Sequence, residues 1–167
     1  MDCSPYRVAA GLLAAVQAHL ADTRAGAAQR IAVYPHAAPA IEFGCNMAWV
    51  GVGSIAPIPG AKGPCGTSGW TLDLTIGVAR CWPVADGNSA PPTAAVDSAA
   101  RDVFDDGEAM RRAVVDAFDD MEFTVKSWQP MNPQGGAHGS TMTVTVHVGW
   151  GAFVEPGSPM LPGDPRA

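Results

Sequence analysis

Apolar residues recur along the chain with a helical period in two regions. In the first region they follow one another at intervals of four, which predicts a helix over about residues 5–24. These residues are Val8, Leu12, Val16 and Leu20. In the second region an apolar stripe with alternating steps of four and three predicts a long helix that Thr93 caps. The stripe consists of Val96, Ala100, Val103, Gly107, Met110, Val114, Ala117 and Met121. Gly107 in its middle indicates a kink or a close contact with a sheet.

Alternation of apolar and polar residues predicts strands elsewhere in the chain. The clearest alternation ends at Pro83 and carries four apolar residues on one face: Leu72, Leu74, Ile76 and Val78. A second alternation predicts a strand over residues 141–148, and shorter extended runs predict strands over 30–34, 47–52 and 123–128. The resulting order, α-β-β-β-α-β-β, predicts the α+β class, with one antiparallel sheet and two helices packed on it.

Stretches rich in glycine and proline separate these elements. Residues 53–69 and 129–140 have this composition and predict two long loops. Beyond residue 150 a proline recurs at every third position, which is typical of an extended polyproline II segment. The chain has 167 residues, a length that suits one domain. We therefore expect a single α+β domain over residues 1–150, followed by an extended tail over residues 151–167.

Charge is scarce and is concentrated in one segment. Charged residues make up 16% of the chain, against about 25% in an average protein, and the net charge is −6. Residues 97–122 hold nine acidic and three basic residues, so this segment accounts for the whole net charge. A basic surface for nucleic acid is therefore not expected. The candidate electrostatic surface consists of Asp97, Asp102, Asp105, Asp106, Glu108, Asp116, Asp119 and Asp120.

This acidic surface has two interpretations. It is either the solvated outer face of the second helix, or an electronegative surface that DNA passes without sticking. Within it, Asp97 with Arg101 and Glu108 with Arg112 have the spacing and order of favourable helical ion pairs.

The four cysteines are Cys3, Cys45, Cys65 and Cys81, and they form no C-x-x-C pair. Cys45 and Cys65 both lie in glycine-rich stretches and could meet, but a reducing compartment favours free thiols. No apolar run approaches the roughly 18 residues of a membrane span, and the N-terminal stretch lacks the pattern of a signal peptide. We therefore expect an origin in the cytoplasm and no contact with a membrane.

Candidate catalytic and metal-binding residues form no recognisable pattern. The spacings of His36, His138 and His147 relative to the cysteines match no common ligand set, with His138 expected in a loop and His147 on the polar face of a strand. Cys65 lies among glycines, but no helix clearly begins after it to lower its pKa. We expect no catalytic, metal or cofactor site, and the tryptophans are expected in the core or at a subunit interface.

Several ordered features together resemble a family of phage proteins. They are the N-terminal helix, the run Cys45-Asn46-Met47-Ala48-Trp49-Val50, the strand LTIGVARCWP, Pro91-Pro92-Thr93 before a long helix, Trp128-Gln129-Pro130 before Gly135-Gly136, and the final strand TMTVTVHVGW. Over about residues 5–150 the chain resembles the tail terminator or head-to-tail connector proteins of long-tailed (siphovirus) phages that infect actinobacteria. The most specific pieces are the strand end Val78–Pro83 and the W-x-P…GG hairpin. Members of the family often carry a cysteine after the two glycines, where this chain has Ala137-His138.

This resemblance implies a virion structural protein without catalytic activity. Six copies would form a ring at the tail–neck junction, assembled in the host cytoplasm, that caps the tail tube and joins it to the head. The implied partners are further copies of the chain, the major tail tube protein, the neck or connector proteins, and genomic DNA passing through the lumen without sequence-specific binding. The sheet would line or flank that lumen. The acidic helix would either face the lumen, where it would repel DNA, or meet a basic neighbouring ring.

Two other functions stay open at the level of sequence. Another connector ring of the neck would share almost all of these features. A small cysteine- or metal-dependent enzyme is the less favoured alternative, because no complete set of catalytic groups accompanies its cysteines.

Overall fold

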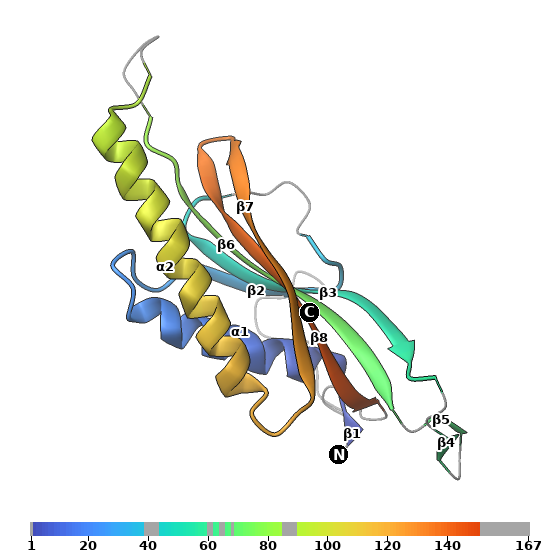
Figure 1. Ribbon diagram of the computed structural model, residues 1–167. Helices are drawn as coiled ribbons and strands as arrows, with labels where there is room; N and C mark the ends of the chain where they lie inside the picture. The colour runs from blue at the N-terminus through green and yellow to red at the C-terminus, as the bar shows by residue number, and fades with distance from the viewer. Residues whose placement is uncertain are drawn as a thin grey trace, which may run out of the picture.

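Two helices pack on one face of a twisted, mostly antiparallel sheet (Figure 1). The computed structural model describes residues 2–38, 44–59, 62–63, 66–67, 69–84 and 90–150. The helices are α1 (Pro5–Ala21) and α2 (Thr93–Ala117). The strands are β1 (Asp2–Cys3), β2 (Arg30–Tyr34), β3 (Met47–Pro57), β4 (Lys62–Gly63), β5 (Gly66–Thr67), β6 (Trp70–Cys81), β7 (Phe123–Gln134) and β8 (Ala137–Trp150). The predicted α+β class and the order of its main elements are confirmed.

The main sheet has the order β1-β8-β6-β3-β2, and β7 also pairs with β8. β3, β6, β8 and β7 are antiparallel neighbours, as predicted. β2 instead runs parallel to β3, so the prediction of a purely antiparallel sheet is wrong at this edge. Parallel pairing requires the chain to return from the end of β2 to the end of the sheet at which β2 began. The 12 residues 35–46 are long enough for this connection, whereas a tight hairpin is not.

The hairpin formed by β7 and β8 is longer than the sequence predicted. Residues 129–140, expected to be a loop, form its outer part, and the chain reverses at Gly135 and Gly136 with positive φ angles of 57° and 80°. Two successive residues with positive φ are the requirement of a tight hairpin turn that fits the twist of the strands. Pro130 and Pro133 are tolerated because β7 is an edge strand beside β8.

The core lies between the helices and the sheet. The predicted apolar face of β6 is fully buried, and the same holds for the central apolar residues of β8. From α1 the core receives Val8, Leu12, Val16 and Leu20, the residues of the first predicted stripe. α2 begins at Thr93 with Pro92 in the capping position, so the predicted cap at Thr93 is displaced by one residue.

Gly107 marks a close contact between α2 and β7, one of its two predicted roles. A Cβ atom there would lie 2.8 Å from Nε1 and 2.9 Å from Cε2 of Trp128. The indole of Trp128 therefore packs directly on the helix backbone.

Candidate functional site

The two most specific motifs of the sequence form a single structural unit at the outer end of the sheet. Antiparallel pairing of β6 with β8 places Arg80 opposite His138 and Cys81 opposite Ala137. The backbone N–H of Trp82 then donates to the carbonyl of Gly136 in the hairpin turn, at 2.8 Å. The Trp82 and His138 rings meet edge to face with centroids 5.0 Å apart. The end of β6 and the W-x-P…GG hairpin are thus adjacent, although about 50 residues separate them along the chain.

A buried ion pair lies beneath this unit. The Arg80 guanidinium donates from Nε and Nη2 to the two carboxylate oxygens of Asp106, at 2.8 and 2.7 Å. The two side chains are only 7% and 1% exposed. Arg80 also donates from Nη1 to Oδ1 of Asn46 and from Nη2 to the carbonyl of Gly26, both at 2.9 Å. One side chain therefore holds together β6, α2 and the segments before β2 and β3.

Burial shifts the ionisation of two groups around this pair. It raises the pKa of the Asp106 carboxyl, and the hydrogen bonds and charge of Arg80 oppose that shift. His138 lies in β8, so the prediction that it occupies a loop is wrong. Burial lowers the pKa of its imidazole, since a charged ring would lose its hydration, while Asp102 and Asp106 act in the opposite direction. Burial therefore favours the neutral form of both groups, and at Asp106 the bidentate contact with Arg80 opposes this effect.

Cys45 and Cys81 form a disulfide with a Cα–Cα distance of 4.6 Å. This finding corrects the expectation that the cysteines are free thiols. It also excludes the considered pairing of Cys45 with Cys65, which itself lies outside the described residues. The bond joins the segment before β3 to the end of β6, directly beside Asn46 and Arg80. Ala137 is the residue that faces Cys81 across the strands.

The eight candidate acidic residues do not share one surface. Asp106 is fully buried, so its assignment to an exposed electrostatic surface is wrong. The reason is its position on the inner stripe of α2, between Val103 and Met110, where Arg80 neutralises it.

Most of the other acids pair with basic residues. Asp102 of α2 lies 2.6 Å from Arg24, three residues after the end of α1, and Asp116 of α2 lies 2.6 Å from His19 of α1. The expected helical pairs of Asp97 with Arg101 and of Glu108 with Arg112 are confirmed at 2.7 and 2.9 Å. Arg111 also pairs with Glu108, and the two guanidinium groups lower the pKa of Glu108 to about 2. Within the described part of the chain, Asp105, Asp119 and Asp120 have no ion pair.

The opposite face of the sheet carries a polar network centred on Asp73 of β6. Its carboxylate accepts hydrogen bonds from Thr145 and Ser54, and it lies 3.0 Å from Nζ of Lys126. The two hydroxyl groups, followed by Lys126, lower the pKa of Asp73. Thr75 and Thr143 pair next to it, so hydroxyl groups dominate this part of the face.

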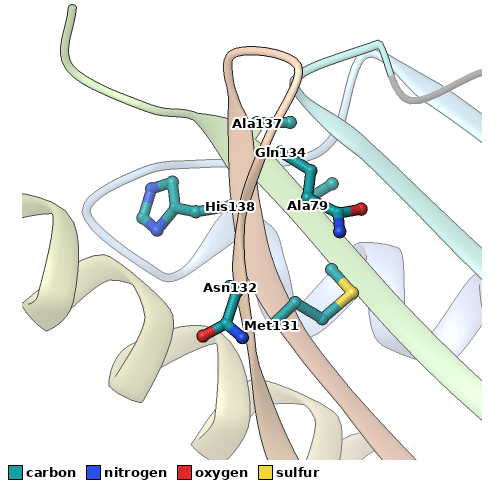
Figure 2. A pocket seen from close by; sticks show the side chains of 6 residues that line it. All are labelled: Ala79, Met131, Asn132, Gln134, Ala137 and His138. Carbon is teal, nitrogen blue, oxygen red and sulfur yellow. The ribbon is translucent and has the colours of Figure 1, made fainter.

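The pocket beside the hairpin turn offers little space for a substrate. The pocket in Figure 2 has a volume of only about 30 Å³, roughly that of one water molecule. His138 points to the side of the hairpin where α2 lies, whereas Ala79 and Met131 lie on the other side (Figure 2). Among the described residues, no cluster of three or more His, Cys, Asp or Glu side chains could hold a metal ion. None of the described helices is long and apolar enough to cross a membrane.

Comparison with known proteins adds no family assignment: no protein-family model and no curated protein matches the chain.

The pairing of Arg80 with Asp106 escaped the sequence analysis, although two signals were present. Arg80 lies an even number of residues from Leu74, Ile76 and Val78, so the alternation of β6 places it on the same, buried face. Asp106 similarly falls on the inner stripe of α2. A buried arginine and a buried aspartate on packed elements are expected to pair, because an isolated buried charge is costly.

Proposed function

We propose that this chain is a structural protein of a phage virion, a tail terminator that forms a ring at the tail–neck junction. The observation that carries the proposal is the convergence of the two most specific family-like motifs. The Val78–Pro83 strand end and the W-x-P…GG hairpin pair with each other through Arg80, Cys81 and Trp82. Motifs that fit one local structure are stronger support for a family than the same motifs scattered over the fold.

The polar face of the sheet supports the proposal that the sheet lines the lumen. Around Asp73 this face carries Ser54, Thr75, Thr143 and Thr145, and the Asp73 carboxylate is matched by Lys126. A hydroxyl-rich surface with balanced charge gives DNA phosphates neither a basic track to bind nor a strong repulsive barrier. Such a surface suits a channel through which DNA slides.

The acidic residues retain a narrower role in this proposal. Five of the eight candidates are engaged in ion pairs, which leaves Asp105, Asp119 and Asp120 as the exposed candidates without one. These three lie on the helix side of the sheet, away from the face proposed to line the lumen, so they would meet a basic neighbouring ring. Replacing them together with asparagine is expected to leave the ring intact and to weaken docking to that neighbouring ring, whereas Asp97→Asn removes a paired surface acid and serves as the control.

The experiment that tests the function joins purified protein to purified phage tails. Electron microscopy of the mixture is expected to show a ring at the head-proximal end of the tail tube, and native mass spectrometry a ring of six copies. Gold labelling of intact particles should fall on the tail–neck junction. A protein that binds neither tails nor filled heads, or that is absent from the particle, would refute the proposal. Label on the portal side of the neck would instead identify it as another connector ring.

A further inference from the structure

The Cys45–Cys81 disulfide lies at the surface, at the outer end of the pairing between β3 and β6. The antiparallel register of these strands ends with Met47 opposite Ala79. Two residues further, the same register brings Cys45 opposite Cys81, where the disulfide joins them. Both cysteines are exposed. A thiolate in solution therefore reaches this bond in the folded protein, and exposed disulfides are the ones that thiols reduce most readily.

Asn46, the residue next to Cys45, has a left-handed backbone conformation with a φ of 64°. Among the described residues it is the one non-glycine residue with a positive φ. Asparagine tolerates this conformation better than most residues, but the conformation persists only where the surrounding structure holds it. The disulfide holds Asn46 on one side, and the first pair of the β3 ladder holds it on the other.

Asn46 connects the start of β2 to the buried ion pair. Its backbone carbonyl accepts hydrogen bonds from the N–H groups of Gln29 and Arg30, at 3.0 and 3.3 Å. Its side-chain Oδ1 accepts a hydrogen bond from Nη1 of Arg80 at 2.9 Å, while Nε and Nη2 of the same guanidinium bind Asp106. A change in the backbone of Asn46 therefore reaches β2 first, because both bonds of the ion pair to Asp106 are independent of it.

Reduction of the disulfide is a two-electron exchange with two thiol groups, from one dithiol or two monothiols. A reagent thiolate attacks one sulfur, forms a mixed disulfide and releases the other cysteine as a thiolate. The second reagent thiol then displaces the remaining cysteine, so the reagent ends as a disulfide. The two cysteine thiolates take up the two protons that the reagent thiols lost. Small thiols of a reducing cytoplasm belong to the class of compound that supplies these electrons.

We propose that the Cys45–Cys81 bond is a redox clasp, which small thiols open in the folded protein, and that its opening releases Asn46 and the start of β2. In the reduced chain no covalent bond fixes Cys45 beside Cys81, so the left-handed conformation of Asn46 loses one of its two constraints. Among the described strands β2 pairs only with β3, so the oxidation state of the clasp alters an edge of the sheet. The clasp does not require a ring of copies, and it goes beyond the proposed function.

The kinetics of reduction test whether the clasp opens in the folded protein. The chain carries Cys3→Ser and Cys65→Ser, so that only this disulfide reacts, and the probe is dithiothreitol. The rate of reduction, followed by alkylation and mass spectrometry, is expected to rise in proportion to the dithiothreitol concentration, with an unchanged circular dichroism spectrum. A rate that reaches a plateau would show that the bond reacts only after unfolding and would overturn the inference. Loss of the folded spectrum on reduction would also overturn it.

Hydrogen exchange measured by NMR tests what the clasp holds. The amides of Gln29 and Arg30 are expected to exchange about tenfold or more faster in the reduced protein than in the oxidised protein. The matched control is the amide of Trp82, which directly follows Cys81 but donates to the carbonyl of Gly136 in the hairpin turn. Its exchange should change by less than about twofold. Unchanged exchange at Gln29 and Arg30, or equal acceleration at Trp82, would overturn the inference.

A variant without the bond separates the clasp from other effects of the reagent. Cys45→Ser combined with Cys81→Ser should show the rapid exchange of Gln29 and Arg30 with and without dithiothreitol. Exchange in this variant equal to that of the oxidised protein would show that the disulfide does not hold the start of β2, and would overturn the inference.

Discussion

The ion pair between Arg80 and Asp106 offers the sharpest test of how this fold is held together. Asp106→Ala removes the carboxylate and leaves the guanidinium in a site where the arginine side chain is 7% exposed. Only the bonds to Asn46 and to the Gly26 carbonyl remain. Breaking one side of a buried pair costs about 3–5 kcal/mol, because the remaining charge is desolvated and uncompensated.

That loss is large for a protein of this size. Whole domains are stable by about 5–15 kcal/mol, so the variant should lose roughly a third or more of its free energy of unfolding. The melting temperature should fall by about 10 °C. Unfolding in guanidinium chloride, followed by tryptophan fluorescence, gives the change in free energy by linear extrapolation.

Two further variants identify the origin of the effect. Asp97→Ala breaks an exposed pair whose side chains are 63% and 68% exposed, so its cost should stay below about 1 kcal/mol. The double variant Arg80→Met, Asp106→Leu leaves no buried charge and should recover most of the stability lost in Asp106→Ala. A cost below about 1 kcal/mol for Asp106→Ala, or a double variant no more stable than Asp106→Ala, would refute the reasoning.

Three other predictions follow from the described contacts. Reducing the Cys45–Cys81 disulfide, which closes a sequence separation of 36 residues, should lower the free energy of unfolding by about 2–4 kcal/mol; equal denaturation curves with and without reductant would contradict this. Gly107→Ala should destabilise α2 because its Cβ would collide with the indole of β7, whereas Gly11→Ala, with no atom within 4 Å, should stabilise α1 by about 0.5–1 kcal/mol, as chemical denaturation can measure. The unfolded chain takes up a proton on His138 more readily than the folded one, whose pKa is lowered from 6.5. The free energy of unfolding should therefore fall as the pH drops below about 6.5, and His138→Gln should flatten this part of a stability–pH profile.

The spacing of apolar residues along the chain is sufficient to predict most of the helices and strands. The apolar patterns of both helices and of β6 and β8 are regular, because each of these elements buries one full face. The outer hairpin was missed since Pro130, Pro133 and the two glycines indicate a loop by composition. Only the tertiary context, an edge strand closed by a glycine turn, makes these residues compatible with a strand.

Only some of the buried contacts in the candidate site could be predicted from the sequence. The strand face of Arg80 and the place of Asp106 on the apolar stripe of α2 both indicated burial, so their pairing could have been inferred. The disulfide could not, because Cys45 and Cys81 are 36 residues apart and the connectivity of four cysteines cannot be deduced from their spacing. The expected reducing compartment weighed against any bond, and that argument says nothing about which thiols the fold brings together.

The buried pair fixes the orientation of α2 as well as stabilising the fold. A bidentate carboxylate can meet Arg80 at only one rotation of α2, and Phe104 lies two residues before Asp106 on the same helix. Phe104 packs on the Trp128 ring with centroids 5.6 Å apart, so the ion pair also sets the geometry of this aromatic contact. Apolar packing tolerates small rotations that a bidentate pair does not, so the Arg80→Met, Asp106→Leu variant should recover stability and still show altered tryptophan fluorescence in the folded state. Fluorescence equal to that of the unaltered chain would show that packing of Gly107 on Trp128 is sufficient to orient the helix.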